Sequence, residues 1–205
     1  MLEHRGGWMM KTANNKRMST EKLVLGAILT ALVIVLQFMG SFIRLGPFAI
    51  SLVLIPIVIG AATCGTKVST WLGFIFSVVV LFTDAAAFLA ISIPGTIITV
   101  LVKGTACGLV AGLAYQLIAK KNRYVAVIVA AIVCPLVNTG IFLLGCLVFF
   151  FEALKEWGIA YGFHNVFEYM IVGMVGLNFL VELGTNIVLS PVIVRILNIK
   201  KKSRN

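Results

Sequence analysis

Charged residues are scarce in this sequence, and acidic residues are scarcer still. Only 12% of the 205 residues are charged, with 17 Lys or Arg against 7 Asp or Glu, where a soluble domain has about 25% charged residues. Apolar residues make up 60% of the chain. Counting glycine raises that share to roughly 69%, against about 45–50% for a soluble domain. This composition excludes a soluble globular protein and leaves little sequence beyond one membrane domain.

Histidine is rare, with two residues, and recognisable metal-binding and catalytic motifs are lacking. The four cysteines lie inside apolar runs, with no C-x-x-C or Cys/His spacing that is typical of a metal site or redox pair, and we interpret them as packing residues: Cys64, Cys107, Cys134 and Cys146. The sequence contains no G-x-S-x-G, H-E-x-x-H or P-loop motif. We therefore expect no cofactor, no metal and no enzymatic activity. Active transport would have to draw on an ion gradient or a partner.

The apolar residues are grouped in runs long enough to cross a bilayer as helices, which takes about 20 residues. The first run exceeds the core of about 7–15 residues of a signal peptide. No segment alternates with period two as a lipid-facing barrel strand would. The predicted fold class is an all-α integral membrane protein with six transmembrane helices, since hydrocarbon cannot satisfy free backbone groups. The predicted spans are 23–43, 49–65, 68–92, 95–119, 124–151 and 173–197.

Basic residues are concentrated on one side of this predicted topology. Six spans place both termini on one side, and 14 of the 17 Lys and Arg residues belong to that side. The positive-inside rule makes it cytoplasmic and predicts a multi-pass protein of the cell membrane. Residues 1–20 would form a polar cytoplasmic leader, 21–199 the membrane domain and 200–205 a basic cytoplasmic tail. The net charge of +10 then reflects orientation and contact with anionic membrane lipid, and no nucleic acid is needed as a partner.

Three ionisable residues lie inside the predicted spans, where charges are costly and mark functional sites by default. They are Asp84, Lys103 and Glu182, each in a different span. At a rise of about 1.5 Å per residue, all three would lie roughly 12–14 Å below the outer surface. Three helices that each place a charge at one depth predict a shared polar site in the outer half of the membrane.

Asparagines extend this predicted polar site. On the last span, asparagine and glutamate recur at i, i+4 and i+8 and therefore share one helix face. The candidate substrate-binding residues are Asp84, Lys103, Asn138, Asn178, Glu182 and Asn186. Two interpretations stay open. The residues could bind a polar ligand, or they could form a structural network in which Lys103 pairs with Asp84 or Glu182 and the asparagines join helices.

The only sizeable predicted loop, 152–172, is rich in aromatic residues and lies on the extracellular side. Its Trp and Tyr residues suit an interfacial belt. The alternative is a loop that folds over a binding site and closes it.

Elsewhere, Gly104, Gly108 and Gly112 form a small face suited to helix packing, and Ala27 and Ala31 could form a docking surface for another membrane subunit.

Three segments, in this order and spacing, carry a resemblance to a known family: Ala27-Ile-Leu-Thr-Ala31, the stretch 50–60 that leads to Gly65, and the stretch 101–112. From about Glu21 to Lys200, the chain resembles the substrate-binding S components of energy-coupling factor (ECF) vitamin transporters. The resemblance implies a six-helix fold with a vitamin site near the extracellular side, covered by the loops after helices one, three and five.

The resemblance also implies partners. A transmembrane coupling subunit would dock on Ala27 and Ala31, and two ATPase subunits would hydrolyse ATP. The predicted function is capture of a small water-soluble vitamin or precursor for uptake. The alternative is a stand-alone secondary transporter or channel that uses Asp84, Lys103 and Glu182 for ion coupling.

Overall fold

The computed structural model describes residues 20–42, 44–45, 48–49 and 52–202. The predicted leader, 1–20, lies outside the described residues except for Thr20, where the first helix begins. Of the predicted tail, residues 200–202 belong to the last helix and the others lie outside the described part.

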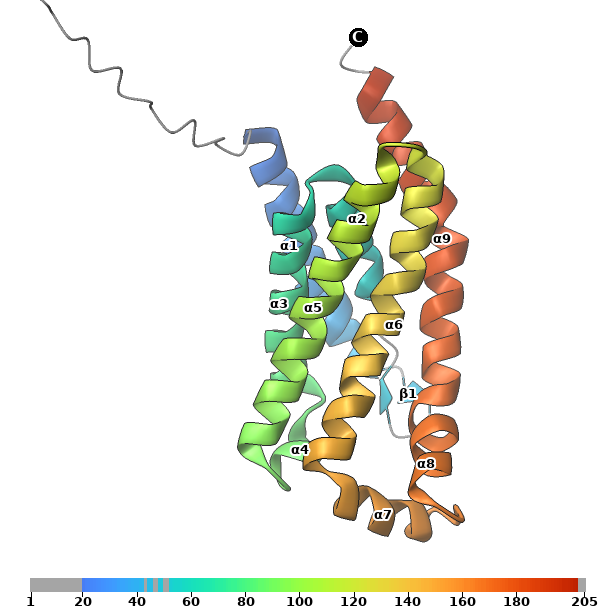
Figure 1. Ribbon diagram of the computed structural model, residues 1–205. Helices are drawn as coiled ribbons and strands as arrows, with labels where there is room; N and C mark the ends of the chain where they lie inside the picture. The colour runs from blue at the N-terminus through green and yellow to red at the C-terminus, as the bar shows by residue number, and fades with distance from the viewer. Residues whose placement is uncertain (1–19, 43, 46–47, 50–51, 203–205) are drawn as a thin grey trace, which may run out of the picture.

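The described chain is almost entirely helical (Figure 1). Its elements are α1 (Thr20–Phe42), β1 (Arg44–Leu45), β2 (Phe48–Ala49), α2 (Leu54–Thr63), α3 (Thr66–Thr83), α4 (Ala86–Leu89), α5 (Ile93–Ala119), α6 (Arg123–Phe149), α7 (Phe151–Ala160), α8 (Val166–Glu168), the π-helix η1 (Tyr169–Gly176) and α9 (Leu177–Lys202). Five segments are long and apolar enough to span a membrane: α1, α3, α5, α6 and Val166–Arg195.

The second predicted span differs from the structure. Instead of one helix over 49–65, the described chain has Ala49 at the end of β2, which pairs antiparallel with β1, and then the ten-residue α2. Ten residues extend about 15 Å, half of the roughly 30 Å hydrocarbon core. Most of α2 is buried against α1, α3, α5, α6 and α9. Its apolar character therefore reflects burial inside protein, which hydropathy does not distinguish from contact with lipid.

The third predicted span, 68–92, is too long at its outer end. Helix α3 ends at Thr83, and the following residues turn back through the short α4. Ser92 then caps α5 by accepting a hydrogen bond from the Gly95 backbone N–H at 3.2 Å. Pro94 lies in the first turn of α5, where its missing N–H costs nothing, and not in the connection itself.

Two groups of elements mark the opposite ends of the bundle (Figure 1). The first residues of α1, the connection between α5 and α6, and the last residues of α9 lie at one end. Strand β1 and helices α4, α7 and α8 lie toward the other end, where α7 runs across the bundle. The chain thus begins and finishes its passage through the bundle at the same end. We call the end with α4 and α7 the α7 end.

Helices α3 and α5 make a close backbone contact through the predicted glycine face. A Cβ atom at Gly104 or Gly108 would meet the backbone of α3, at the carbonyl oxygens of Gly73 and Ser69 respectively. The Ser69 hydroxyl donates a hydrogen bond of 2.6 Å to the Gly108 carbonyl across this contact. The prediction that these glycines serve helix packing is confirmed, and the contact fixes the helix that carries Lys103.

Candidate substrate-binding pocket

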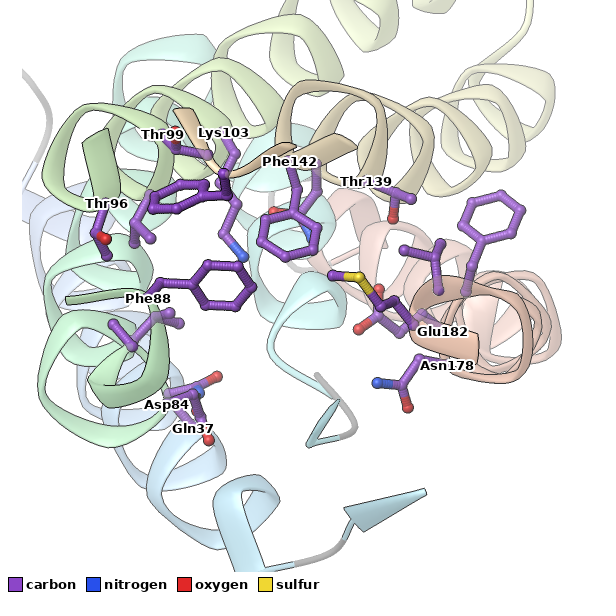
Figure 2. Close-up of a pocket in the computed structure, with 18 residues that line it drawn as sticks. Gln37, Asp84, Phe88, Thr96, Thr99, Lys103, Thr139, Phe142, Asn178 and Glu182 are labelled. Carbon is purple, nitrogen blue, oxygen red and sulfur yellow. Dashed lines mark hydrogen bonds between the residues drawn. The ribbon is translucent and has the colours of Figure 1, made fainter. Parts of the chain in front are cut away.

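A pocket of about 100 Å³ lies inside the bundle, toward the α7 end. That volume is several times the roughly 10–15 Å³ that one water molecule requires. The residues around it come from α1, α3, α5, α6, η1, α9 and the segment that contains α4 (Figure 2). They are Gln37, Val80, Asp84, Ala85, Phe88, Thr96, Thr99, Val100, Lys103, Asn138, Thr139, Phe142, Phe150, Met174, Val175, Asn178, Phe179 and Glu182.

Lys103 projects from α5 toward the middle of this pocket (Figure 2). Its Nζ atom lies 4.9 Å from the ring centroid of Phe142 and 5.9 Å from that of Phe76, within the range of cation–π attraction. Among the described residues, none forms an ion pair with Lys103, although the carboxylates of Glu182 and Asp84 both act on it electrostatically. Within the described residues, Lys103 thus makes neither of the ion pairs, with Asp84 or with Glu182, that the structural interpretation includes.

Asp84 lines the pocket from a position that differs from its predicted one. It directly follows the last residue of α3 instead of lying eight residues inside a span, because the helix ends early. Its Oδ2 atom accepts hydrogen bonds from the Gln37 amide at 2.7 Å and from the Thr83 hydroxyl at 2.8 Å. Helix α1 thus contributes a buried amide to the pocket wall and holds this carboxylate in place.

The last helical segment supplies the wall across from Asp84 (Figure 2). Asn178 and Glu182 are both buried and both line the pocket. They follow the π-helix η1, a wide-turned form that often occurs at functional sites. Asn186 is also buried, but it is not among the lining residues, and its Nδ2 donates to the Glu182 backbone carbonyl at 2.8 Å. The structure therefore brings five of the six candidate residues together and leaves Asn186 outside.

Two further buried polar residues line the pocket from α5 and α6. Thr99 is 4% exposed and Asn138 is 6% exposed. Neither Thr99 Oγ1 nor Asn138 Oδ1 has a hydrogen-bond partner among the described residues. Burying such groups without partners costs free energy, so polar partners from a ligand would stabilise them.

Aromatic side chains pack against one another beside the pocket, toward the α7 end. Phe88 of α4 packs edge-on against Phe142, Phe150 and Trp157, with centroid separations of 5.7, 5.0 and 5.6 Å. The predicted loop 152–172 is mostly helical and supplies Trp157, while Tyr161 on the same segment stays exposed. This segment thus contacts the pocket wall through Trp157 and Phe88, although none of its residues is among those that line the pocket, and it also presents aromatic groups outward.

Sequence reasoning missed several lining residues. Gln37 carried a usable signal, because it is the only amide or charged side chain in the predicted span 23–43. Phe88 and Phe142 carried no such signal, since an aromatic residue among other apolar residues does not reveal what it contacts.

On the outside of α1, Ala27 and Ala31 are both exposed, on a face that does not line the pocket.

Comparison with known proteins agrees with this picture. No curated protein and no solved structure matches the chain. A family model described as "ECF transporter, substrate-specific component" matches residues 21–194, which confirms the resemblance. Such components are non-catalytic, multi-pass membrane subunits that bind a small-molecule substrate and work with a transmembrane coupling subunit and ATPases. With most of its length matched by the model, the chain belongs to the family of ECF transporter substrate-specific components.

Proposed function

We propose that this chain captures a small water-soluble vitamin or vitamin precursor from outside the cell and that two partner ATPases power its uptake. The observation that carries the proposal is the pocket. It gathers Gln37, Lys103, Asn138 and Glu182 from four helices of an otherwise apolar bundle. Polar groups at membrane depth are costly and are retained where they act. In this proposal Asp84, Lys103, Asn138, Asn178 and Glu182 contact the substrate.

The proposed orientation places the α7 end outside and both termini in the cytoplasm. Lys120, Lys121 and Arg123 lie at the end where α1 begins, as the positive-inside rule expects of a cytoplasmic end. All four native cysteines are buried, so single introduced cysteines report their own side. In intact cells, a membrane-impermeant maleimide should label Lys155→Cys on α7. Lys121→Cys should react only after permeabilisation, and the reverse pattern would contradict the proposed orientation.

The proposed docking site for the coupling subunit is the exposed face of α1. Ala27 and Ala31 are small and lie one helical turn apart, which allows close approach of another helix. The leucine and isoleucine residues beside them, Ile28 and Leu32, are exposed as well. This surface faces away from the substrate, so docking and substrate capture can occur together in the cell membrane.

The test begins with the purified chain and a set of water-soluble vitamins. One of them should raise its thermal stability, because a ligand that binds only the folded state stabilises it. That vitamin should enter liposomes only when the coupling subunit and both ATPases are present with ATP. Proton-driven uptake by the chain alone would contradict the proposal.

Two asparagines on the last helix provide a matched pair of variants. Asn178 lines the pocket and Asn186 does not, although both are buried amides on α9. Asn178→Ala should weaken vitamin binding, whereas Asn186→Ala should leave the affinity unchanged in folded protein. Equal losses of affinity would count against the pocket as the substrate site.

A further inference from the structure

The contacts of Lys103 restrict the chemistry of the substrate. Its ammonium group carries three donors. Within the described part of the chain, the contacts it makes are to the rings of Phe142 and Phe76, and no oxygen accepts a hydrogen bond from it. Aromatic rings attract a cation but satisfy none of its N–H groups. A bound group with negative oxygen atoms would satisfy them.

The two carboxylates of the pocket are placed differently from each other. Asp84 is held at the wall by Gln37 and Thr83. Glu182 lies with Asn178 on the opposite side (Figure 2). The lining therefore presents a cation at its middle and acceptor groups at its sides, which is complementary to a molecule that combines a negative group with N–H or O–H donors.

The lining holds a single lysine, no arginine and two carboxylates, so it can pair with one negative group at most and calls for donors on the rest of the molecule. Asn138 Oδ1 is a further buried acceptor that lacks a partner among the described residues. Phe88 and Phe142 offer apolar contact to the middle of a bound molecule.

We propose that the substrate is a small organic monoacid that presents its carboxylate to Lys103 and its N–H or O–H donors to Asn138 and the side of the pocket formed by Asn178 and Glu182. The inference rests on the proposed function, because it names the substrate class of the same pocket. Under this proposal, Lys103 is the residue that gives an acid a higher affinity than its neutral analogue.

The experiment uses the full chain in detergent, incubated with yeast-extract medium, re-isolated and extracted for mass spectrometry. The extracted compound and its primary amide, nearly isosteric and neutral, are then the two probes for isothermal titration calorimetry. The compound should be a carboxylic acid, and the amide should bind about 10- to 150-fold more weakly, the range expected for losing a hydrogen bond to a charged group.

Two lysine variants complete the design. Lys103→Met should lose affinity for the acid by the same factor while it binds the amide as the unmodified chain does, which also shows that it is folded. Lys155→Met, an exposed position on α7, should bind both probes normally. An extracted compound without a carboxylate, equal affinity for acid and amide, or loss of both probes in Lys103→Met would overturn the inference. If no compound is extracted, the proposed function itself fails.

Discussion

Replacing Gly108 by alanine tests how much the structure depends on the close approach of α3 and α5. The added Cβ would meet the Ser69 carbonyl oxygen and lie 2.9 Å from its carbon. Both are backbone atoms, so no side chain can rotate away and the helices must separate. Separation breaks the 2.6 Å hydrogen bond from the Ser69 hydroxyl to the Gly108 carbonyl.

The expected change in unfolding free energy combines three contributions. Losing the hydrogen bond costs about 1 kcal/mol, and overpacking with backbone shifts costs about 1–3 kcal/mol. Alanine returns about 1 kcal/mol of helix propensity. Gly108→Ala should therefore destabilise the chain by about 1–3 kcal/mol.

Gly184→Ala is the matched control, since among the described residues no atom outside the helix's own backbone lies within 4 Å of a Cβ at that exposed position. It should stabilise by up to about 1 kcal/mol. Unfolding by SDS titration in mixed micelles, followed by tryptophan fluorescence, measures both changes. If the two variants have the same stability, the close contact between α3 and α5 does not exist as described.

Three further variants test the site and its surroundings. Phe88→Ala should destabilise the chain by about 3–5 kcal/mol in the same titration and speed substrate release. Phe82 is 83% exposed, so Phe82→Ala should change neither the stability nor the release rate. Similar effects from the two variants would refute a specific role for the aromatic contacts of Phe88. Gln37→Leu removes the 2.7 Å hydrogen bond to a carboxylate and should cost about 1.5–3 kcal/mol; an unchanged unfolding midpoint would contradict this. Ala27→Leu with Ala31→Leu should preserve vitamin binding and abolish ATP-driven uptake, and normal uptake would rule out docking there.

The polar site was partly predictable from the sequence because charges and amides inside apolar runs are rare. Asp84, Lys103 and Glu182 line one pocket, as their common predicted depth suggested. The estimate for Asp84 was nevertheless wrong in its detail, since it lies at the end of α3. Helix periodicity places residues on a face, but it does not say what packs against that face. Asn186 therefore shared a predicted face with Asn178 without reaching the pocket.

From the sequence alone, the chain is a bundle of apolar helices with a few polar residues inside, because hydropathy and charge can be read residue by residue without knowing the contacts. Tertiary structure decided the rest. It made most of the predicted second span the short buried helix α2, since protein and lipid are similarly apolar surroundings for a helix. It brought Gln37 to Asp84 and Phe88 over the pocket, because such contacts join residues far apart in the chain.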